Sequence, residues 1–258
     1  FHAAAYKHVP IQELHPWTAV NTNIGGTLNI IELSNSYLVE KFVLVSTDKA
    51  VNPTNVMGAS KRAAEMYCQA LNQEHKTKFI ITRFGNVLGS NGSVIPLFKK
   101  QINTGGPVTV THPNVTRFFM TIKEACQLVL EASSMGEGGE IFVFDMGESI
   151  KIIDLAHKMI QLAGLEIDKD IKIKIIGLRP GEKMFEETLN INESTSKTHH
   201  PKILIGKVSS VNLLEINKSI EKLIMFIKSQ QNDEIIKQMK EIIPEYISNN
   251  SEFSKFDN

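Results

Sequence analysis

Apolar positions along the chain fall into short runs and into longer segments with helical spacing. Short apolar runs of the kind found in buried strands lie at 42–45, 78–83, 108–111, 140–145 and 171–176. Helical spacing is seen at 17–37, 57–71, 94–103, 121–133, 152–163, 213–227 and 234–243. Strands that alternate with helices predict a parallel sheet, so we expect an α/β fold: a partial Rossmann-like sheet plus a smaller mixed lobe.

The segments between and after these elements are predicted to be irregular. Polar residues and a proline predict a loop over about 192–202, and the polar end of the chain, NNSEFSKFDN, predicts a frayed tail. The glycine pair Gly25-Gly26 interrupts the pattern at 17–37. It indicates close packing, a nearby ligand or simply a weaker helix, because glycine costs roughly 1 kcal/mol relative to alanine in a helix.

Composition narrows the classes of partner. The 258 residues include 28 basic and 28 acidic side chains, so the net charge is zero and gives no reason to expect nucleic acid or a membrane surface as a partner. The two cysteines, Cys68 and Cys126, lie in helical patterns and are expected to be buried free thiols in a reducing compartment. His199-His200 lacks further ligands nearby, so we expect no metal site. No apolar run reaches the length of a membrane span and no signal peptide is visible, which predicts a cytoplasmic protein.

Candidate chemistry gathers where the first strand ends. Four polar residues, Ser46 to Lys49, follow the apolar run at 42–45, and a helix with Lys61 in its first turns begins soon afterwards. Ligands of open α/β sheets bind beyond the carboxyl ends of the strands, so these side chains are candidate active-site groups. The alternative is a polar loop in which Asp48 and Lys49 form a solvated surface ion pair.

Several motifs carry a resemblance to a known family. They are AAAYKHVP, TNIGGT, STDKAVNPTNVMGASK, RFGNVLGSNGSVIPLF, TRFFMTIKEA, GGEIFVFDMG and GLRPGEKMFEE. Together they resemble the polysaccharide-biosynthesis (capsule) branch of UDP-N-acetylglucosamine 4,6-dehydratases, within the extended short-chain dehydrogenase/reductases. The resemblance spans about residues 1–190. It implies that 1–110 form the C-terminal part of an NAD-binding Rossmann-like domain with the catalytic strand and helix. It also implies that 111–190 form an interleaved substrate-binding lobe and 191–258 a mostly helical extension.

The resemblance implies a reaction and a set of roles. The family oxidises C4 of the sugar with NAD, eliminates water across C5 and C6, and returns the hydride to C6. Lys49 is then the base for the C5 proton and Asp48 the acid for the C6 hydroxyl, while Lys61 holds the nicotinamide ribose. A lysine acts as a base near neutral pH only when its pKa is lowered; burial or Lys61 would lower the pKa of Lys49, whereas Asp48 would raise it.

Further positions match the family's binding residues. The expected cofactor contacts are Ala3, Ala4, Asn23, Ser46 and Lys61. The expected substrate contacts are Asn86 and the arginines Arg117 and Arg179, which would meet the diphosphate, and Glu182, which would accept from the uridine ribose. The resemblance also implies a homo-oligomer, and a membrane region upstream in longer members.

Two departures from the family pattern affect these expectations. No G-x-G-x-x-G turn occurs in the chain, so we expect a fragment that lacks the glycine-rich half, has an exposed apolar sheet edge and binds NAD weakly. Met57 stands where most short-chain dehydrogenases have a tyrosine, so proton transfer at the 4-hydroxyl falls to Thr47 or Asp48. The alternatives are an inactive nucleotide-sugar-binding fragment, a structural piece that joins a partner, and a related UDP-sugar epimerase.

Overall fold

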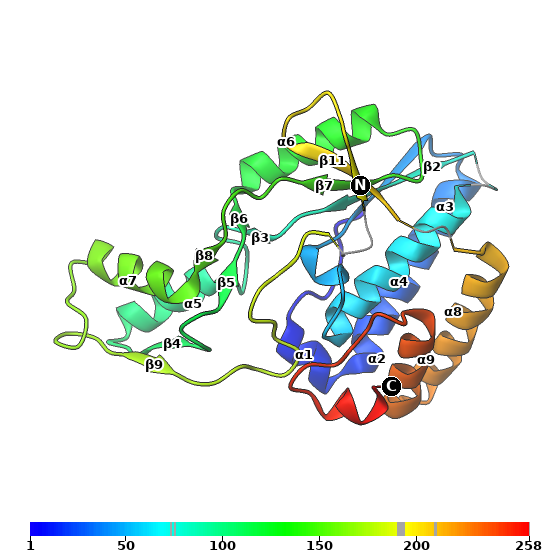
Figure 1. The fold of residues 1–258 in the computed structure, drawn as a ribbon. Helices are drawn as coiled ribbons and strands as arrows, with labels where there is room; N and C mark the ends of the chain where they lie inside the picture. The colour runs from blue at the N-terminus through cyan, green and yellow to red at the C-terminus, as the bar shows by residue number, and fades with distance from the viewer. Residues whose placement is uncertain (73, 75, 190–193, 209–210, 258) are drawn as a thin grey trace.

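A computed structural model describes the chain except residues 73, 75, 190–193, 209–210 and 258. Its main part is a five-stranded sheet in the order β1-β2-β7-β11-β10 (Figure 1). The strands are β1 (Lys41–Val45), β2 (Lys78–Arg83), β7 (Ile141–Phe144), β10 (Ser194–Lys197) and β11 (Ile203–Lys207). The first three are parallel, which confirms the predicted parallel α/β sheet, while β11 and β10 extend it in antiparallel fashion.

The loop predicted over 192–202 is wrong for Ser194–Lys197, which form β10, and is confirmed for 198–202, where the chain turns into β11; residues 192 and 193 lie outside the described residues. This strand is polar and mostly exposed, so it has no apolar alternation that would reveal it. Its extended form depends on pairing with β11, from Ser194 opposite Lys207 to Lys197 opposite Leu204.

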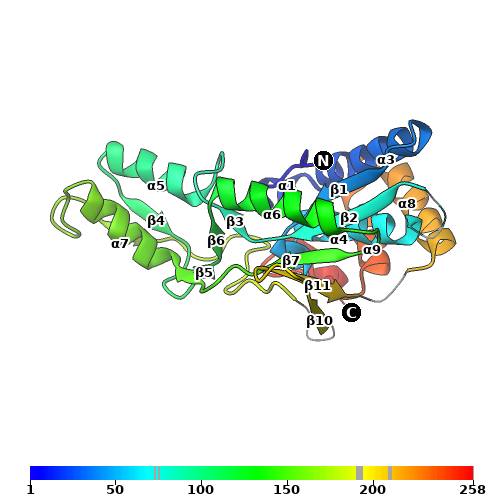
Figure 2. The same cartoon turned by 90° about the horizontal axis from the view of Figure 1, so that it is seen from above.

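Helices cover both faces of the sheet. Helix α4 (Val56–Leu71) packs on one face, where Ala64 and Cys68 meet Leu44, Phe79 and Ile81. Helix α6 (Ile122–Met135) covers the opposite face: the sheet lies between the two helices in Figure 1, and α6 lies over the strands in the view from above in Figure 2. Burial on both faces explains why the parallel strands β1, β2 and β7 read as continuous apolar runs.

The C-terminal helices enclose α4. Helices α8 (Leu213–Lys228) and α9 (Asn232–Ile242) pack against it through a stripe of buried residues that includes Ile216, Ile220 and Leu223. The frayed tail predicted for the last residues is wrong for 252–256, which form a 3₁₀ helix with Phe253 buried. Apolar burial of this phenylalanine outweighs the polar composition around it.

The helix predicted at 17–37 is confirmed, since the backbone is helical without a break from Pro16 to Ser36, but its middle part has π-helical hydrogen bonding. Helix α2 (Pro16–Ala19) leads into a π-helical stretch at Val20–Gly25, and α3 (Gly26–Ser36) follows. A Cβ added at Gly25 or Gly26 would meet no heavy atom closer than 3.8 Å, so packing within the described chain does not require glycine at either position. A short helix, α1 (Val9–Leu14), precedes these pieces.

A smaller lobe extends from the carboxyl ends of the sheet strands (Figure 1). Its core includes Phe98, Val108, Ile160 and Ile171 and lies between helices and short strand pairs. These elements are β3 (Asn86–Val87), α5 (Val94–Asn103), β4 (Val108–Val110), β5 (Thr116–Arg117), β6 (Phe119–Met120), β8 (Ile150–Lys151), α7 (Ile152–Leu162) and β9 (Ile173–Ile175). Strand β9 is shorter than the run predicted at 171–176, and the strands of two residues are too short to give a sequence pattern.

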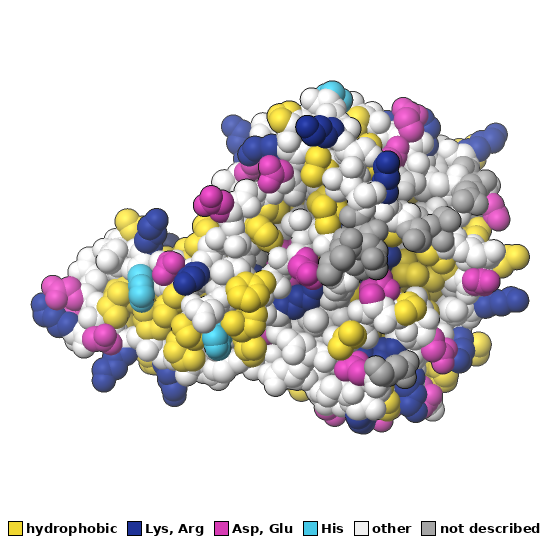
Figure 3. Space-filling model, viewed as in Figure 1, with side chains coloured by type: hydrophobic (Ala, Val, Ile, Leu, Met, Phe, Trp, Pro, Cys, Tyr) yellow, Lys and Arg dark blue, Asp and Glu magenta, His cyan; other side chains and the backbone are white. Residues whose placement is uncertain are grey.

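The surface carries both signs of charge. On the face in Figure 3, basic and acidic side chains are interspersed, and hydrophobic side chains gather over the lobe. Cys68 is buried as predicted, but Cys126 is exposed on α6, so that part of the prediction is wrong. None of the helices in the described part of the chain is both long enough and apolar enough to cross a membrane.

Candidate functional site

The end of β1 turns its polar residues toward the lobe. Asp48 begins a 3₁₀ turn that runs to Ala50, and its backbone N–H donates to the carbonyl of Phe84 at 3.1 Å. The Thr47 hydroxyl donates to Asp48 Oδ1 at 2.9 Å. Gly58 of α4 lies directly behind the turn, because a Cβ there would come within 2.1 Å of the Lys49 carbonyl oxygen. The turn is therefore held between the next strand and the start of α4.

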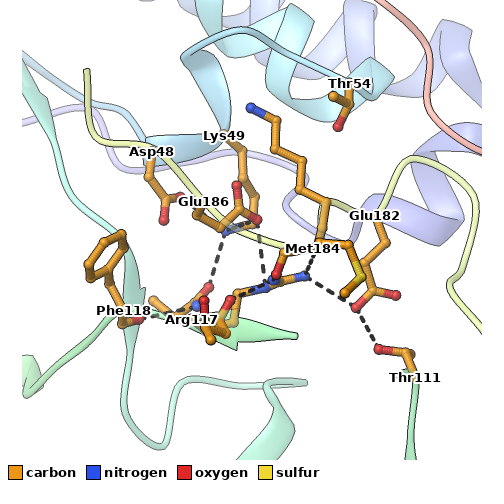
Figure 4. A network of polar contacts seen from close by, with 12 residues as sticks. Asp48, Lys49, Thr54, Thr111, Arg117, Phe118, Glu182, Met184 and Glu186 are labelled. Atoms are coloured by element: carbon orange, nitrogen blue, oxygen red, sulfur yellow. Dashed lines mark hydrogen bonds and ion pairs between the residues drawn. The ribbon is translucent and has the colours of Figure 1, made fainter. Parts of the chain in front are cut away.

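Lys49 lies at the centre of the polar cluster (Figure 4). Its Nζ is 3.0 Å from Asp48 Oδ1 and 3.4 Å from Glu186 Oε1, and it donates to Asn86 Oδ1 at 3.2 Å. Burial favours the neutral amine, but the carboxylates of Asp48 and Glu186 outweigh burial and raise the pKa of Lys49. Of the two opposing effects expected from the sequence, the carboxylates dominate, so Lys49 is an ammonium ion in this arrangement.

The lobe contributes a second group of charges. The Arg117 guanidinium lies 3.2 Å from Glu182 Oε1 and 3.6 Å from Glu186 Oε1, and it also donates to backbone carbonyls, including that of Lys183 at 2.9 Å. Glu182 is buried and accepts from the Thr111 hydroxyl at 3.0 Å. Arg179 is half exposed and pairs with the other oxygen of Glu182 at 3.3 Å. The two arginines thus share one carboxylate beside the cavity.

Lys61, on α4, is buried and lines the same cavity. It is 4% exposed, and in the described part of the chain no hydrogen bond or ion pair is formed by its ammonium group. Burial lowers the pKa of Lys61 to about 8, against a weaker opposing effect of Glu65. Met57, one turn earlier on α4, also lines the cavity and is 4% exposed.

Two of the residues expected to contact the cofactor, Ser46 and Asn23, form hydrogen bonds within the protein. The Ser46 hydroxyl donates to Glu65 Oε1 at 2.6 Å, inside a buried cluster in which Arg83 also pairs with Glu65. The Asn23 amide bonds both the N–H and the carbonyl of Tyr6, which fastens the first residues of the chain to the π-helical stretch. These contacts give both side chains a structural task in addition to the role that the resemblance implies.

A cavity of about 450 Å³ brings most of the predicted residues together. Its lining includes the following members of the predicted set: Ala3, Ser46, Thr47, Lys49, Met57, Lys61, Asn86, Arg117, Arg179 and Glu182. Asp48 lies directly behind Lys49 with no exposed surface, while Ala4 and Asn23 lie outside the lining.

Glu186 is the residue that the sequence analysis missed. It lines the cavity and touches both Lys49 and Arg117, yet in the sequence it is one of two adjacent glutamates. The only available signal was its place in the motif GLRPGEKMFEE, which does not tell which glutamate turns inward.

Comparison with known proteins places this geometry in context. Residues 1–208 match the family model described as polysaccharide biosynthesis protein. The capsular polysaccharide biosynthesis protein CapD of Staphylococcus aureus is 55% identical over 87% of this chain and 37% of its own length. Two further relatives match over 75% of this chain and 56% of their own length. One is a UDP-N-acetylglucosamine 4,6-dehydratase (inverting) of Campylobacter jejuni, at 40% identity, and the other a UDP-glucose 4-epimerase of Rickettsia bellii, at 43%.

The fold also has a solved counterpart. The X-ray structure of Pen from Bacillus thuringiensis superposes with a TM-score of 0.74 and 36% identity, and the match covers 86% of this chain and 74% of that one. The chain spans between 37% and 56% of the length of the curated relatives named above. The family match covers most of the chain and agrees with the identities and the shared fold: the chain belongs to the polysaccharide biosynthesis protein family and has a Rossmann-like fold.

Proposed function

We propose that this chain supplies the acid–base and substrate-binding residues of a 4,6-dehydratase that acts on UDP-N-acetylglucosamine. The observation that carries the proposal is the pair formed by Asp48 Oδ1 and Lys49 Nζ, 3.0 Å apart at the end of β1. Water elimination across C5 and C6 needs one base and one acid close together, and an amine beside a carboxyl group provides both.

The raised pKa of Lys49 has a direct consequence for this chemistry. As an ammonium ion, Lys49 cannot accept a proton. Transfer of one proton along the hydrogen bond from Nζ to Asp48 Oδ1 gives a neutral amine and a neutral carboxylic acid in a single step. The amine then takes the C5 proton, the carboxylic acid protonates the departing C6 hydroxyl, and water leaves. The pair returns to ammonium and carboxylate with no net change in charge.

The binding groups fit the remaining parts of a nucleotide sugar. Arg117 and Arg179 carry planar guanidinium groups suited to phosphate oxygens, and both lie at the cavity edge. A diphosphate that reached them would compete with Glu182 for the guanidinium N–H groups. Glu182 would then be free to accept from a ribose hydroxyl, as the resemblance implies.

The cavity also offers a place for the nicotinamide half of NAD. Lys61 is a buried donor that faces the cavity and has no partner among the described residues, which fits the ribose hydroxyls of such a cofactor. Ser46 and Ala3 also line the cavity. The chemistry that NAD supplies when bound is removal of a hydride from C4 and its return to C6. The glycine-rich turn that binds the pyrophosphate has no counterpart in this sequence.

The second candidate is a 4-epimerase, favoured by the relative of that name. An epimerase needs hydride transfer at C4 but neither a base at C5 nor an acid at C6, so the Asp48–Lys49 pair would have no task in it.

The test is product analysis with the full-length protein, NAD and UDP-N-acetylglucosamine. A dehydratase gives a 4-keto-6-deoxy sugar that has lost the mass of one water, whereas an epimerase gives a product of unchanged mass. Unchanged mass together with an inverted C4 would contradict the proposal, and Lys49→Met serves as the inactive control.

A further inference from the structure

Glu186 contacts cations from two different parts of the molecule (Figure 4). Its Oε1 lies 3.4 Å from Lys49 Nζ, at the end of β1, and 3.6 Å from Arg117 Nε, on β5 of the lobe. Its side chain is 3% exposed. The neighbouring Glu187 is 45% exposed and pairs with Lys183. Of the two adjacent glutamates, only Glu186 reaches into the cavity cluster.

Burial of this carboxylate needs compensation. Taking a carboxylate out of water costs several kcal/mol, which nearby cations and hydrogen bonds must offset. Glu186 Oε2 is buried and has no hydrogen-bond partner among the described residues. Among the described residues, the cost of burying this carboxylate is offset by the two cations at Oε1. The position of the Glu186 side chain therefore depends on Lys49 and Arg117.

We propose that Glu186 is a positioning residue that joins Lys49 to Arg117 and holds the amine beside Asp48. The inference rests on the proposed function, in which Lys49 faces the sugar and Arg117 the diphosphate. Glu186 thereby connects the binding of the diphosphate with the state of the acid–base pair.

The charges around Lys49 predict that two substitutions shift the pKa of this amine in opposite directions. Asp48 and Glu186 favour the ammonium form, while Arg117 on β5 and Lys7 in the first segment oppose it, as burial does. Replacing Glu186 by glutamine keeps the size and removes the charge, so the pKa of Lys49 falls. Replacing Arg117 by methionine removes a repulsion, so the pKa of Lys49 rises.

The experiment measures the reactivity of Lys49 directly. Trace labelling with acetic anhydride across a pH series, read by mass spectrometry of the peptide that contains Lys49, gives the pKa of this amine. We expect Glu186→Gln to move the midpoint to lower pH and Arg117→Met to move it to higher pH. Glu187→Gln is the matched control and leaves the midpoint unchanged.

An unchanged midpoint in Glu186→Gln, or an equal shift in Glu187→Gln, would overturn the proposal. Circular dichroism establishes that each variant is folded. If Glu186→Gln does not fold, Arg117→Met still tests the proposal. A labelling midpoint of Lys49 that does not move to higher pH in this variant refutes the link between Lys49 and Arg117. Labelling requires no turnover. A protein without dehydratase activity would refute the proposed function, but the labelling midpoints would still test the role of Glu186.

Discussion

Lys61→Met should make the protein more stable at neutral pH. Lys61 is 4% exposed, and burial lowers its pKa from the usual 10.5 to about 8. At roughly 1.36 kcal/mol per pH unit, keeping this ammonium group charged opposes folding by about 3 kcal/mol. Methionine has a similar stem and no charge. Glu65, which Lys61 faces, keeps its pairs with Arg62 and Arg83.

The gain depends on pH in a defined direction. Below about pH 8 the amine is protonated in both the folded and the unfolded chain, so the full penalty applies. Between about 8 and 10.5 the unfolded chain binds more protons than the folded one, and the stability of the wild type rises with pH. The advantage of Lys61→Met is therefore about 3 kcal/mol at pH 7 and under about 1 kcal/mol at pH 10.

Urea unfolding followed by circular dichroism at the two pH values measures this difference. Lys218→Met, at an exposed position on α8, is the control and should change stability little at either pH. A Lys61→Met variant that is less stable than wild type at pH 7, or whose gain is equal at both pH values, would refute the reasoning. The stabilised variant should also lose activity, because Lys61 is proposed to hold the nicotinamide ribose.

Three further predictions concern the frame of the site. Glu65→Ala removes the buried carboxylate that two arginines share and should lower the free energy of unfolding by about 3 kcal/mol or more, measured by urea titration; an unaffected midpoint would contradict this. Gly58→Ala places a Cβ 2.1 Å from the Lys49 carbonyl oxygen and should reduce both stability and turnover, so a variant with wild-type unfolding and turnover would argue against it. Thr47→Val should lose more activity in the product assay than Met57→Ala, because the hydroxyl is the group hydrogen-bonded to the Asp48 carboxylate; the reverse order would assign the larger role to the methionine.

Patterns local in sequence predicted most of the fold. Strands buried on both faces appear as apolar runs, and the stripe at Ile216, Ile220 and Leu223 identified a packed helix. Strand β10 could not be recognised because it is polar and its extended form depends on pairing with β11, and the 3₁₀ helix at 252–256 could not because it depends on contacts with distant segments. The Ser251 hydroxyl, for example, bonds Glu13 at the other end of the chain.

The site was predictable in its residue types and less so in its electrostatics. Motif positions identified Lys49, Arg117 and Glu182, which the fold brings to one cavity. The sequence left open whether the pKa of Lys49 rises or falls, since burial opposes the carboxylates of Asp48 and Glu186, and the contact with Glu186 is made only in the folded chain. Asn23 and Ser46 were expected to meet a cofactor, but local spacing does not reveal their bonds to Tyr6 and Glu65.

The central claim is that Lys49 removes the proton from C5 of the sugar. The most direct measurement is incubation of UDP-N-acetylglucosamine with the full-length protein and NAD in D₂O, with proton NMR of the product at C5. We predict deuterium at C5 with the wild type and none with Lys49→Met, which should also lose elimination. Undiminished deuterium incorporation and turnover in Lys49→Met would contradict the account and require a different base.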